Sequence, residues 1–278
     1  MLNLSIIGLG QIGGSLGLAL KNKALKNCYH ITGISRKQDT LNTALKLKAA
    51  DEVCLSLNAA KNADIVVICT PVDTITPIYK ELAEIVGKDT VITDTGSVKY
   101  SIEKDIKAFA KKSGFVSFIG SHPMAGREKN GISSADADMF MNTKVVVTSE
   151  LKQLTKKENL IVKMWKDAGA DIAKISAKKH DALVAFTSHL PHIIAFLLSK
   201  SYKKIKQKNP QIDTLTAGSF KSITRVAVSS ADMWAPIFAL NGKNIEKYLD
   251  EFIKELTYFK KNLENKQKIK QEILKTQK

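Results

Sequence analysis

Arginine is nearly missing from this sequence, although basic residues are plentiful. Of 43 lysines and arginines, only Arg36, Arg127 and Arg225 are arginines. A guanidinium binds carboxylates and phosphates through two parallel hydrogen bonds, which a lysine ammonium cannot do. Codon usage in an AT-rich genome would also remove arginines, but all three that remain lie beside other motif residues. The pattern indicates an enzyme that handles anions.

Cysteine is also scarce, and its spacing excludes two classes of protein. The three cysteines, Cys28, Cys54 and Cys69, form no CxxC pair. We therefore expect neither a disulfide framework nor a zinc site, and no metal is predicted. The apolar start of the chain lacks the basic leader of a signal peptide. No apolar run approaches the roughly 20 residues that span a bilayer. We therefore expect a cytoplasmic protein with no membrane partner.

Aromatic residues make up only 6% of the chain, and they are not interleaved with its lysines. The net charge of +16 would otherwise suggest a nucleic-acid partner. The lysines are scattered, however, and toward the C-terminus they alternate with glutamates at helical spacing, as on a solvated face. We expect no nucleic-acid binding.

The first half of the chain alternates strand and helix patterns, which predicts a Rossmann-like, doubly wound parallel sheet in an α/β fold. Asp64–Cys69 is apolar on both faces, as expected for a central parallel strand. The strands predicted are Leu2–Ile7, His30–Ile34, Asp64–Cys69, Thr90–Thr93, Phe115–Gly120, Lys144–Thr148 and Ala170–Ile175.

From Ala177 onward the sequence shows only helical periodicity. Pro191 lies inside the first long helical stretch, which predicts a kink there or a helix boundary near Leu190. We expect a dinucleotide-binding domain over residues 1–176 and an all-helical substrate and dimerisation domain over residues 177–278. A helical domain that buries little on its own is suited to forming a homodimer.

A GxGxxG motif follows the first predicted strand and opens the next helix. Such glycines allow a tight turn, close approach of a pyrophosphate and close helix packing, and the helix N-terminus offers N–H groups to the phosphates. The cofactor-binding residues predicted here are Gly8, Leu9, Gly10, Gln11, Ile12 and Gly13. Thr70, Pro71 and Val72, just past a central strand, should lie beneath the same cofactor.

The end of the second predicted strand distinguishes between the two nicotinamide dinucleotides. NAD sites usually carry an acid there, which binds the ribose hydroxyls. Here Ser35 and Arg36 follow the strand, and no acid precedes Asp39. Both side chains could bind a 2′-phosphate, which favours NADP. NAD, with Arg36 stacked on the adenine, is the alternative.

Four of the five histidines belong to two motifs. His122 follows a predicted strand in Ser-His-Pro-Met-Ala-Gly, so it should project toward the nicotinamide. His180, His189 and His192 lie on the opening helices of the second domain. His189 and His192 share a helical face if Pro191 does not break the helix.

These motifs together give the chain a specific resemblance. It resembles the prephenate/arogenate (cyclohexadienyl) dehydrogenase family of tyrosine biosynthesis over nearly its whole length. The supporting motifs are GLGQIGGSLG at Gly8–Gly17, TDTGSVK at Thr93–Lys99, SHPMAG at Ser121–Gly126, HDALVAFTSHLPH at His180–His192 and GSFKSITRVA at Gly218–Ala227.

The resemblance implies oxidative decarboxylation of prephenate to 4-hydroxyphenylpyruvate with NAD(P)+. His122 matches the family's catalytic histidine, which accepts the C4 hydroxyl proton, and Ser97 matches the serine that orients this hydroxyl. Arg225 matches the arginine that binds a substrate carboxylate. The pocket implied by the resemblance is completed by His189, His192, Lys221, Gly218 and Trp234. Core packing is an equally good interpretation of Trp234.

The side chain of the substrate stays open. His192 and Glu128 favour prephenate, because arogenate-specific members of the family tend to lack both. The Ser35–Arg36 pair instead resembles cyanobacterial arogenate enzymes, so an arogenate or dual-specificity dehydrogenase is an alternative. Arg127, beside Glu128, has two possible partners, that acid or a substrate carboxylate.

Two further functions compete with this interpretation. A β-hydroxyacid dehydrogenase would need a catalytic lysine in the helical domain, and Lys221 is the one lysine in such a motif. A non-catalytic dinucleotide sensor would not need Ser97, His122 or Arg225.

Overall fold

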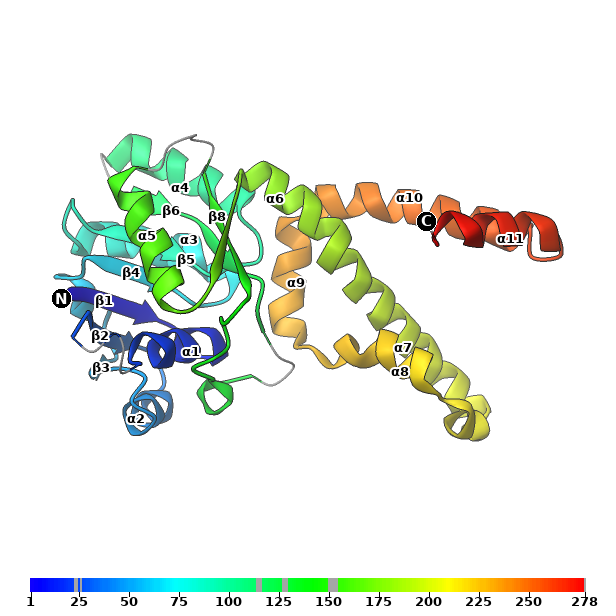
Figure 1. The fold of residues 1–278 in the computed structure, drawn as a ribbon, viewed down its shortest axis with the longest axis horizontal. Coiled ribbons are helices and arrows are strands. Elements are labelled where there is room, and N and C mark those ends of the chain that lie inside the picture. Colours follow the sequence, from blue (N-terminus) through cyan, green and yellow to red (C-terminus); the bar gives the residue numbers. More distant parts are fainter. Residues whose placement is uncertain (23–24, 26, 114–116, 127–129, 150–154, 278) are drawn as a thin grey trace. The chain divides into compact units, whose positions relative to one another are not determined.

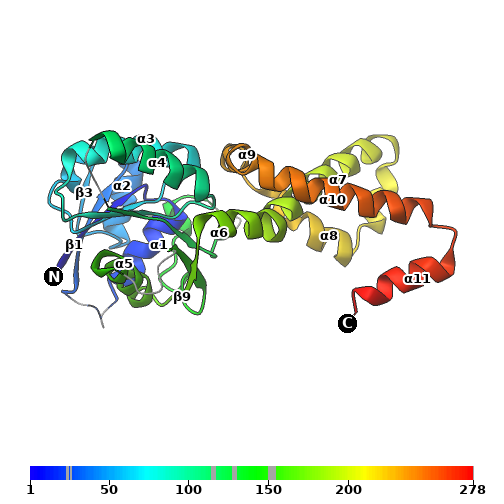
Figure 2. The ribbon, with the colours of Figure 1, turned by 90° about the horizontal axis from the view of Figure 1, so that it is seen from above.

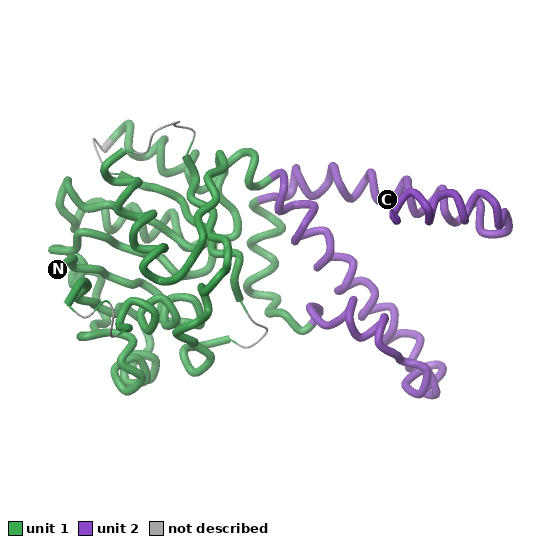
Figure 3. Tube along the Cα trace, viewed as in Figure 1, with its two compact units in different colours: residues 1–181, 228–240 green, residues 182–227, 241–278 purple. Residues whose placement is uncertain are grey.

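A computed structural model describes the whole chain except residues 23–24, 26, 114–116, 127–129, 150–154 and 278. The chain forms two compact units (Figure 3). One comprises Met1–Asp181 with Val228–Leu240, and the other comprises Ala182–Ala227 with Asn241–Lys278. We call them the sheet unit and the helical unit.

The sheet unit is built on a six-stranded sheet in the order β3-β2-β1-β4-β5-β6, with all strands parallel. Its strands are β1 (Leu2–Ile7), β2 (Tyr29–Ile34), β3 (Glu52–Cys54), β4 (Ile65–Ile68), β5 (Val91–Asp94) and β6 (Ser117–Ile119). The predicted doubly wound parallel sheet is confirmed. Strand order reverses between β1 and β4, and ligands of such sheets bind where the carboxyl ends of these strands meet.

Helices cover both faces of this sheet (Figures 1 and 2). The helices α1 (Gln11–Leu20) and α5 (Lys156–Asp167) lie on one face, and α3 (Val72–Ile85) and α4 (Tyr100–Ser113) lie on the other. The helix α2 (Gln38–Lys46) connects β2 to β3. Every residue of β4 is buried, as its apolar sequence predicts.

Two predicted strands belong to a different sheet from the one expected. β8 (Lys144–Thr148) and β9 (Asp171–Ile175) join β7 (Ser121–Pro123) in a separate three-stranded sheet, in which β7 and β8 are antiparallel. β3 and β7 are not predicted by the sequence. Each is three residues long, which is too short to show the two-residue alternation of a strand.

The first long helical stretch passes through Pro191 without ending. α6 (Ala177–Val184) continues through a π-helical turn (Ala185–His189) into α7 (Leu190–Lys208). In this turn the Leu190 N–H donates to the Ala185 carbonyl, five residues back. A π turn re-aligns the carbonyls ahead of a proline, which itself has no N–H to donate.

This continuity gives a helix whose length can be compared with the thickness of a bilayer. By length and composition alone, the helix Ala177–Lys208 is long and apolar enough to cross one. The sequence does not show this helix as one apolar run, because polar residues, including His180, His189 and His192, interrupt it.

The remaining helices of the second half are η5 (Pro210–Leu215), α8 (Gly218–Thr224), η6 (Arg225–Val228), α9 (Ala231–Leu240), α10 (Gly242–Lys261) and α11 (Lys266–Lys275). Among them α9 packs against α3 and belongs to the sheet unit. The compact units therefore do not divide the chain at a single point, and the boundary at residue 176 stays a prediction.

Candidate active site

The turn between β1 and α1, which we call the glycine turn, requires glycine at two positions. Gly8 has φ +91°, and a Cβ atom there would lie 2.8 Å from the Cys69 carbonyl oxygen. A Cβ atom on Gly13 would lie 2.2 Å from the Gly8 carbonyl oxygen. Both contacts are with backbone atoms that cannot move aside, so the tight turn depends on these residues.

The middle glycine has a different role. Apart from its chain neighbours, no atom of the described residues lies within 4 Å of a Cβ built on Gly10, so its backbone faces open space among them. Gly10 precedes α1 without a side-chain cap, and the first turn of α1 carries no acid. This helix start therefore offers N–H groups and a positive dipole end, which fits a dinucleotide pyrophosphate.

The other residues predicted in this motif differ in what they can offer a ligand. The Leu9 side chain is buried in the core of the sheet unit, so only its backbone can face a cofactor. Gln11 and Ile12 are half-buried at the start of α1. The Oε1 atom of Gln11 lies 4.0 Å from a Cβ built on Gly126, which places the SHPMAG loop beside this turn.

The loop after β4 lies against the same turn. The Thr70 methyl group is 2.9 Å from a Cβ built on Gly8. The hydroxyl of Thr74 donates to the Thr70 hydroxyl at 2.8 Å, which fixes the loop at the start of α3. Pro71 is exposed and Val72 is buried. The structure thus brings the predicted Thr70–Val72 segment to the glycine turn.

Ser35 and Arg36 follow β2 at the carboxyl edge of the sheet. The Ser35 N–H donates to the Cys54 carbonyl at 3.2 Å, and its hydroxyl oxygen accepts from the Lys37 N–H at 3.3 Å. Arg36 is exposed. Its guanidinium is accessible to a charged ligand.

Ser97 and His122 also belong to the sheet unit. Ser97 is half-buried in the turn between β5 and α4, and His122 is half-buried on β7. A buried network holds the backbone beside His122. The Ser121 N–H donates to an Asp94 carboxylate oxygen at 3.2 Å, and the Ser121 carbonyl accepts from Lys99 Nζ at 2.9 Å.

Lys99 and Asp94 form an ion pair in which both side chains are fully buried. Burial raises the pKa of the Asp94 carboxyl, against the lowering effect of the Lys99 ammonium and of two backbone N–H donors. Breaking such a pair by removing one partner leaves a buried charge and is strongly destabilising. The pair therefore fixes the position of β7, and with it His122.

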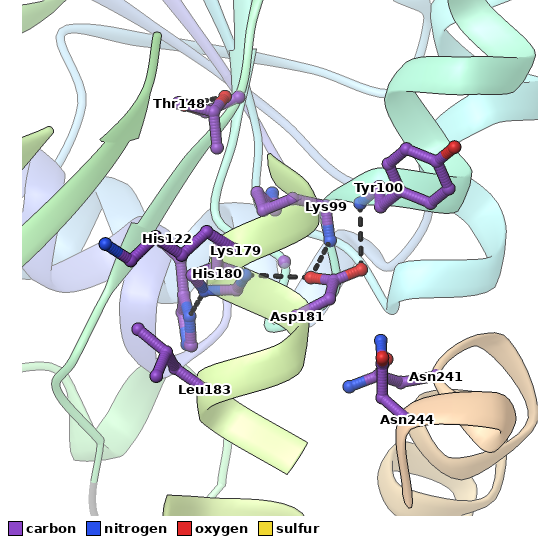
Figure 4. A network of polar contacts seen from close by, with 12 residues as sticks. Lys99, Tyr100, His122, Thr148, Lys179, His180, Asp181, Leu183, Asn241 and Asn244 are labelled. Atoms are coloured by element: carbon purple, nitrogen blue, oxygen red, sulfur yellow. Dashed lines mark hydrogen bonds and ion pairs between the residues drawn. The ribbon is translucent and has the colours of Figure 1, made fainter. Parts of the chain in front are cut away.

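The His122 ring is held by a chain of hydrogen bonds (Figure 4). Its Nδ1 atom lies 2.8 Å from Nε2 of His180, and His180 Nδ1 lies 2.8 Å from Oδ1 of Asp181. Asp181 also accepts from the backbone N–H groups of Lys99 at 2.8 Å and Tyr100 at 2.9 Å. The sequence places His180 and Asp181 in a motif but gives them no role.

The helical unit contains the predicted carboxylate-binding group and two histidines. Arg225 is exposed at the end of α8 and lies close enough to His192 to influence its titration. His192 Nδ1 donates to the Ser188 carbonyl at 2.9 Å. Burial lowers the pKa of His192, the Ser188 bond opposes this, and Arg225 adds to the lowering.

His189 is fully buried rather than open to a ligand. The Asn244 side chain donates to Oδ1 of Asn241 at 2.7 Å, and Nδ2 of Asn241 lies 3.1 Å from Nδ1 of His189. Since this amide nitrogen is a donor, His189 Nδ1 accepts. Sequence reasoning missed Asn241, and nothing local to it signals this contact 52 residues away.

The remaining predicted pocket residues are dispersed. Lys221 and Gly218 are exposed on α8 of the helical unit. Trp234 is buried on α9 of the sheet unit, with its ring 5.2 Å from that of Phe238. This packing agrees with a core role for Trp234. Glu128 and Arg127 lie outside the described residues.

Comparison with known proteins identifies related sequences over nearly the whole chain. The family model "Prephenate dehydrogenase, nucleotide-binding domain" matches residues 16–174, and "Prephenate dehydrogenase, dimerization domain" matches residues 176–276. The glycine turn precedes these ranges, so its assignment rests on its geometry. A cyclohexadienyl dehydrogenase of Zymomonas mobilis is 34% identical over 91% of this chain and 86% of its own length.

Two further relatives agree with these matches. A prephenate dehydrogenase of Lactococcus lactis is 32% identical over 92% of this chain and 72% of its own length. The crystal structure of prephenate dehydrogenase from A. aeolicus, in complex with hydroxyphenyl propionate and NAD+, is similar with a TM-score of 0.85 at 30% identity. It aligns over 99% of this chain and 94% of that one.

Proposed function

Because the chain belongs to the prephenate dehydrogenase family, we propose that it catalyses the oxidative decarboxylation of prephenate to 4-hydroxyphenylpyruvate in tyrosine biosynthesis. The observation that carries this proposal is the juxtaposition, in one unit, of a dinucleotide-type glycine turn and a histidine base held by hydrogen bonds. The cofactor is a nicotinamide dinucleotide, which supplies the hydride acceptor when bound.

His122 acts as the base in this reaction. Its ring accepts the proton of the C4 hydroxyl while the C4 hydride is lost, and CO2 leaves C1 as the ring becomes aromatic. Ser97 orients the hydroxyl by a hydrogen bond. Because aromatisation makes the reaction downhill, the protein has to supply mainly positioning and proton transfer.

Arg225 binds a substrate carboxylate, since its exposed guanidinium can form two parallel hydrogen bonds to it. His192 stays neutral beside Arg225 and can accept a hydrogen bond at Nε2, because its Nδ1 already donates to the Ser188 carbonyl. Lys221, Gly218 and Glu128 complete the proposed substrate set. His189 and Trp234 belong to it in the sequence prediction, but both side chains are buried.

NADP is the proposed cofactor, with NAD as the alternative. Ser35 and the exposed Arg36 follow β2, and the nearest following acid, Asp39, already lies in the first turn of α2. The 2′-phosphate of NADP fits a guanidinium and a hydroxyl better than a carboxylate would. The related A. aeolicus enzyme was crystallised with NAD+, so this assignment needs its own test.

We further propose a cytoplasmic homodimer that acts on a small molecule. The match to a dimerisation domain supports the homodimer. The three cysteines are free thiols, as expected of a protein in a reducing compartment.

The direct test is formation of reduced nicotinamide with prephenate or arogenate, each with NAD or NADP. Turnover of prephenate with NADP is expected. In the Arg36→Ala variant, we expect the apparent KM for NADP to rise about 10- to 100-fold, the effect of one lost charge-assisted hydrogen bond. Its KM for NAD should barely change. Turnover of arogenate alone would favour the alternative substrate, and no turnover with any pair would favour a dinucleotide sensor.

A further inference from the structure

The direction of every hydrogen bond in the His122–His180–Asp181 chain can be deduced from its Asp181 end. Both carboxylate oxygens of Asp181 accept backbone N–H groups, Oδ1 from Lys99 and Oδ2 from Tyr100. A carboxylate is an acceptor only, so Nδ1 of His180, 2.8 Å from Oδ1, must carry the proton.

The next bond follows from this protonation. A neutral imidazole with a proton on Nδ1 has its lone pair on Nε2. With His180 neutral, its Nε2 accepts, and Nδ1 of His122, 2.8 Å away, donates. This places the proton of neutral His122 on Nδ1 and the ring lone pair on Nε2.

Burial makes this arrangement resistant to rearrangement. His180 is 1% exposed and Asp181 is 2% exposed, so water does not compete for their hydrogen bonds. The rings of His122 and His180 lie 5.0 Å apart at 79°, which fixes the His122 ring plane as well.

Lys99 connects this chain to the main-chain position of His122. Its backbone N–H donates to Asp181, while its buried ammonium donates to the carbonyl of Ser121, the residue before His122. One residue thus supports both the backbone and the ring of His122.

From this geometry we infer that His180 and Asp181 are positioning residues that hold neutral His122 in its Nδ1-protonated form, so that Nε2 is the base. This inference depends on the proposed function in one respect, namely the reaction in which His122 acts as the base. When Nε2 takes up a proton, the His122–His180 bond becomes charge-assisted, which stabilises the product state of the transfer. An aspartate that orients a histidine acts in this way in the serine protease triad.

The first test reads the tautomer directly, by two-bond 1H–15N NMR correlations of the full-length protein labelled with [15N]histidine. The His122 signals are assigned by their loss in His122→Asn. The neutral His122 ring is expected to show a protonated Nδ1 and an unprotonated Nε2. A protonated Nε2 in the wild-type protein would overturn the inference, and this result needs no variant at His180.

The second test compares His180→Leu with His180→Gln. Leucine removes the acceptor, so we expect the Nδ1-protonated form to lose its dominance and kcat to fall about 10- to 100-fold, part of the 10²- to 10⁴-fold that a general base contributes. The KM for prephenate should barely change, since His180 does not touch substrate. Glutamine can place its Oε1 near the position of Nε2, so it should restore most of kcat.

A matched control is His30→Leu. His30 also lies beside carboxylates, 3.9 Å from Asp51 and 3.5 Å from Glu52, but outside this chain of bonds. Its loss should leave kcat and the His122 tautomer unchanged. An unchanged kcat and tautomer in His180→Leu would overturn the inference. If the wild-type protein turns over neither prephenate nor arogenate, the proposed function fails, while the NMR result still decides the tautomer.

Discussion

Single residues in this protein act through the direction of their hydrogen bonds. Nδ1 of His192 donates to the Ser188 carbonyl, while Nδ1 of His189 accepts from the Asn241 amide. The two histidines share one sequence motif, but the same ring nitrogen, Nδ1, is a donor in one and an acceptor in the other. Residue type alone therefore does not fix what a histidine offers to a substrate.

Replacing His122 with asparagine should abolish most of the proton transfer. The amide keeps a polar group but cannot act as a base, so kcat with prephenate should fall about 10²- to 10⁴-fold. Cofactor affinity, measured by fluorescence titration, should persist because the glycine turn is built from other residues. An unchanged kcat would show that another group is the base.

Replacing Arg225 with alanine should have two linked effects. The KM for prephenate should rise about 10- to 100-fold, because a charge-assisted hydrogen bond is lost. The pKa of His192, measured by NMR titration, should also rise, since the nearby positive charge that lowers it is removed. Lys203→Ala, on the exposed part of α7, is the matched control. A His192 pKa that does not move would mean that Arg225 lies elsewhere in solution.

The lowered pKa of His192 also predicts how the stability of the protein depends on pH. The folded-state pKa of His192 is lower than its unfolded value, so the folded protein binds this proton less readily. The stability associated with neutral His192 is present above the unfolded pKa of about 6.5 and is lost as the pH falls below it. Thermal unfolding of His192→Gln should show a weaker pH dependence in this range than the wild-type protein.

Among the elements, the helix starts of the sheet unit divide into two kinds. α5 is capped by its own side chains, because the Thr155 hydroxyl accepts from the Glu158 N–H and the Glu158 carboxylate accepts from the Thr155 N–H. α1 has no side-chain cap. A helix start without its own cap has N–H groups available for a ligand, and α1 is the helix that the glycine turn leads into.

Thr155→Ala should destabilise the protein by about 1 kcal/mol, because it removes one half of the capping box. The measurement is chemical denaturation followed by circular dichroism. Thr43→Ala is the control, since the Thr43 hydroxyl only donates back to the Asp39 carbonyl within α2. Equal effects of the two substitutions would show that the capping box adds nothing to stability.

At the scale of the whole molecule, the helical unit leaves many large apolar side chains exposed. Leu197 on α7 and Ile253, Leu256 and Phe259 on α10 are examples. Exposed apolar side chains of this size are stabilised when a subunit interface covers them. The proposed homodimer would cover them.

Size-exclusion chromatography with light scattering should give twice the mass of one chain. Leu256→Glu should shift the protein toward monomer, because it places a charge within an apolar interface. Thr257→Glu, on the next residue of α10, should leave the mass unchanged. A monomeric wild-type protein would refute the homodimer.

The sequence by itself determined the local features of this protein. The apolar run of β4, the GxGxxG turn and the helical periodicity after Ala177 depend on neighbouring residues, so they could be read directly from the chain. The family resemblance rests on the same short motifs. Ser97, His122 and Arg225 were identified as candidates for this reason.

Only the tertiary structure decided the contacts that give these residues their roles. His180 forms a hydrogen bond with His122, which lies 58 residues earlier in the chain. Asp181 accepts a hydrogen bond from the backbone N–H of Lys99, which lies 82 residues earlier. The same holds for the burial of Lys99 and for the sheet that β8 and β9 join. Such contacts depend on how strands and helices pack, and no local pattern encodes them. The sequence therefore identified the proposed base, while the packing determines which of its ring nitrogen atoms carries the proton.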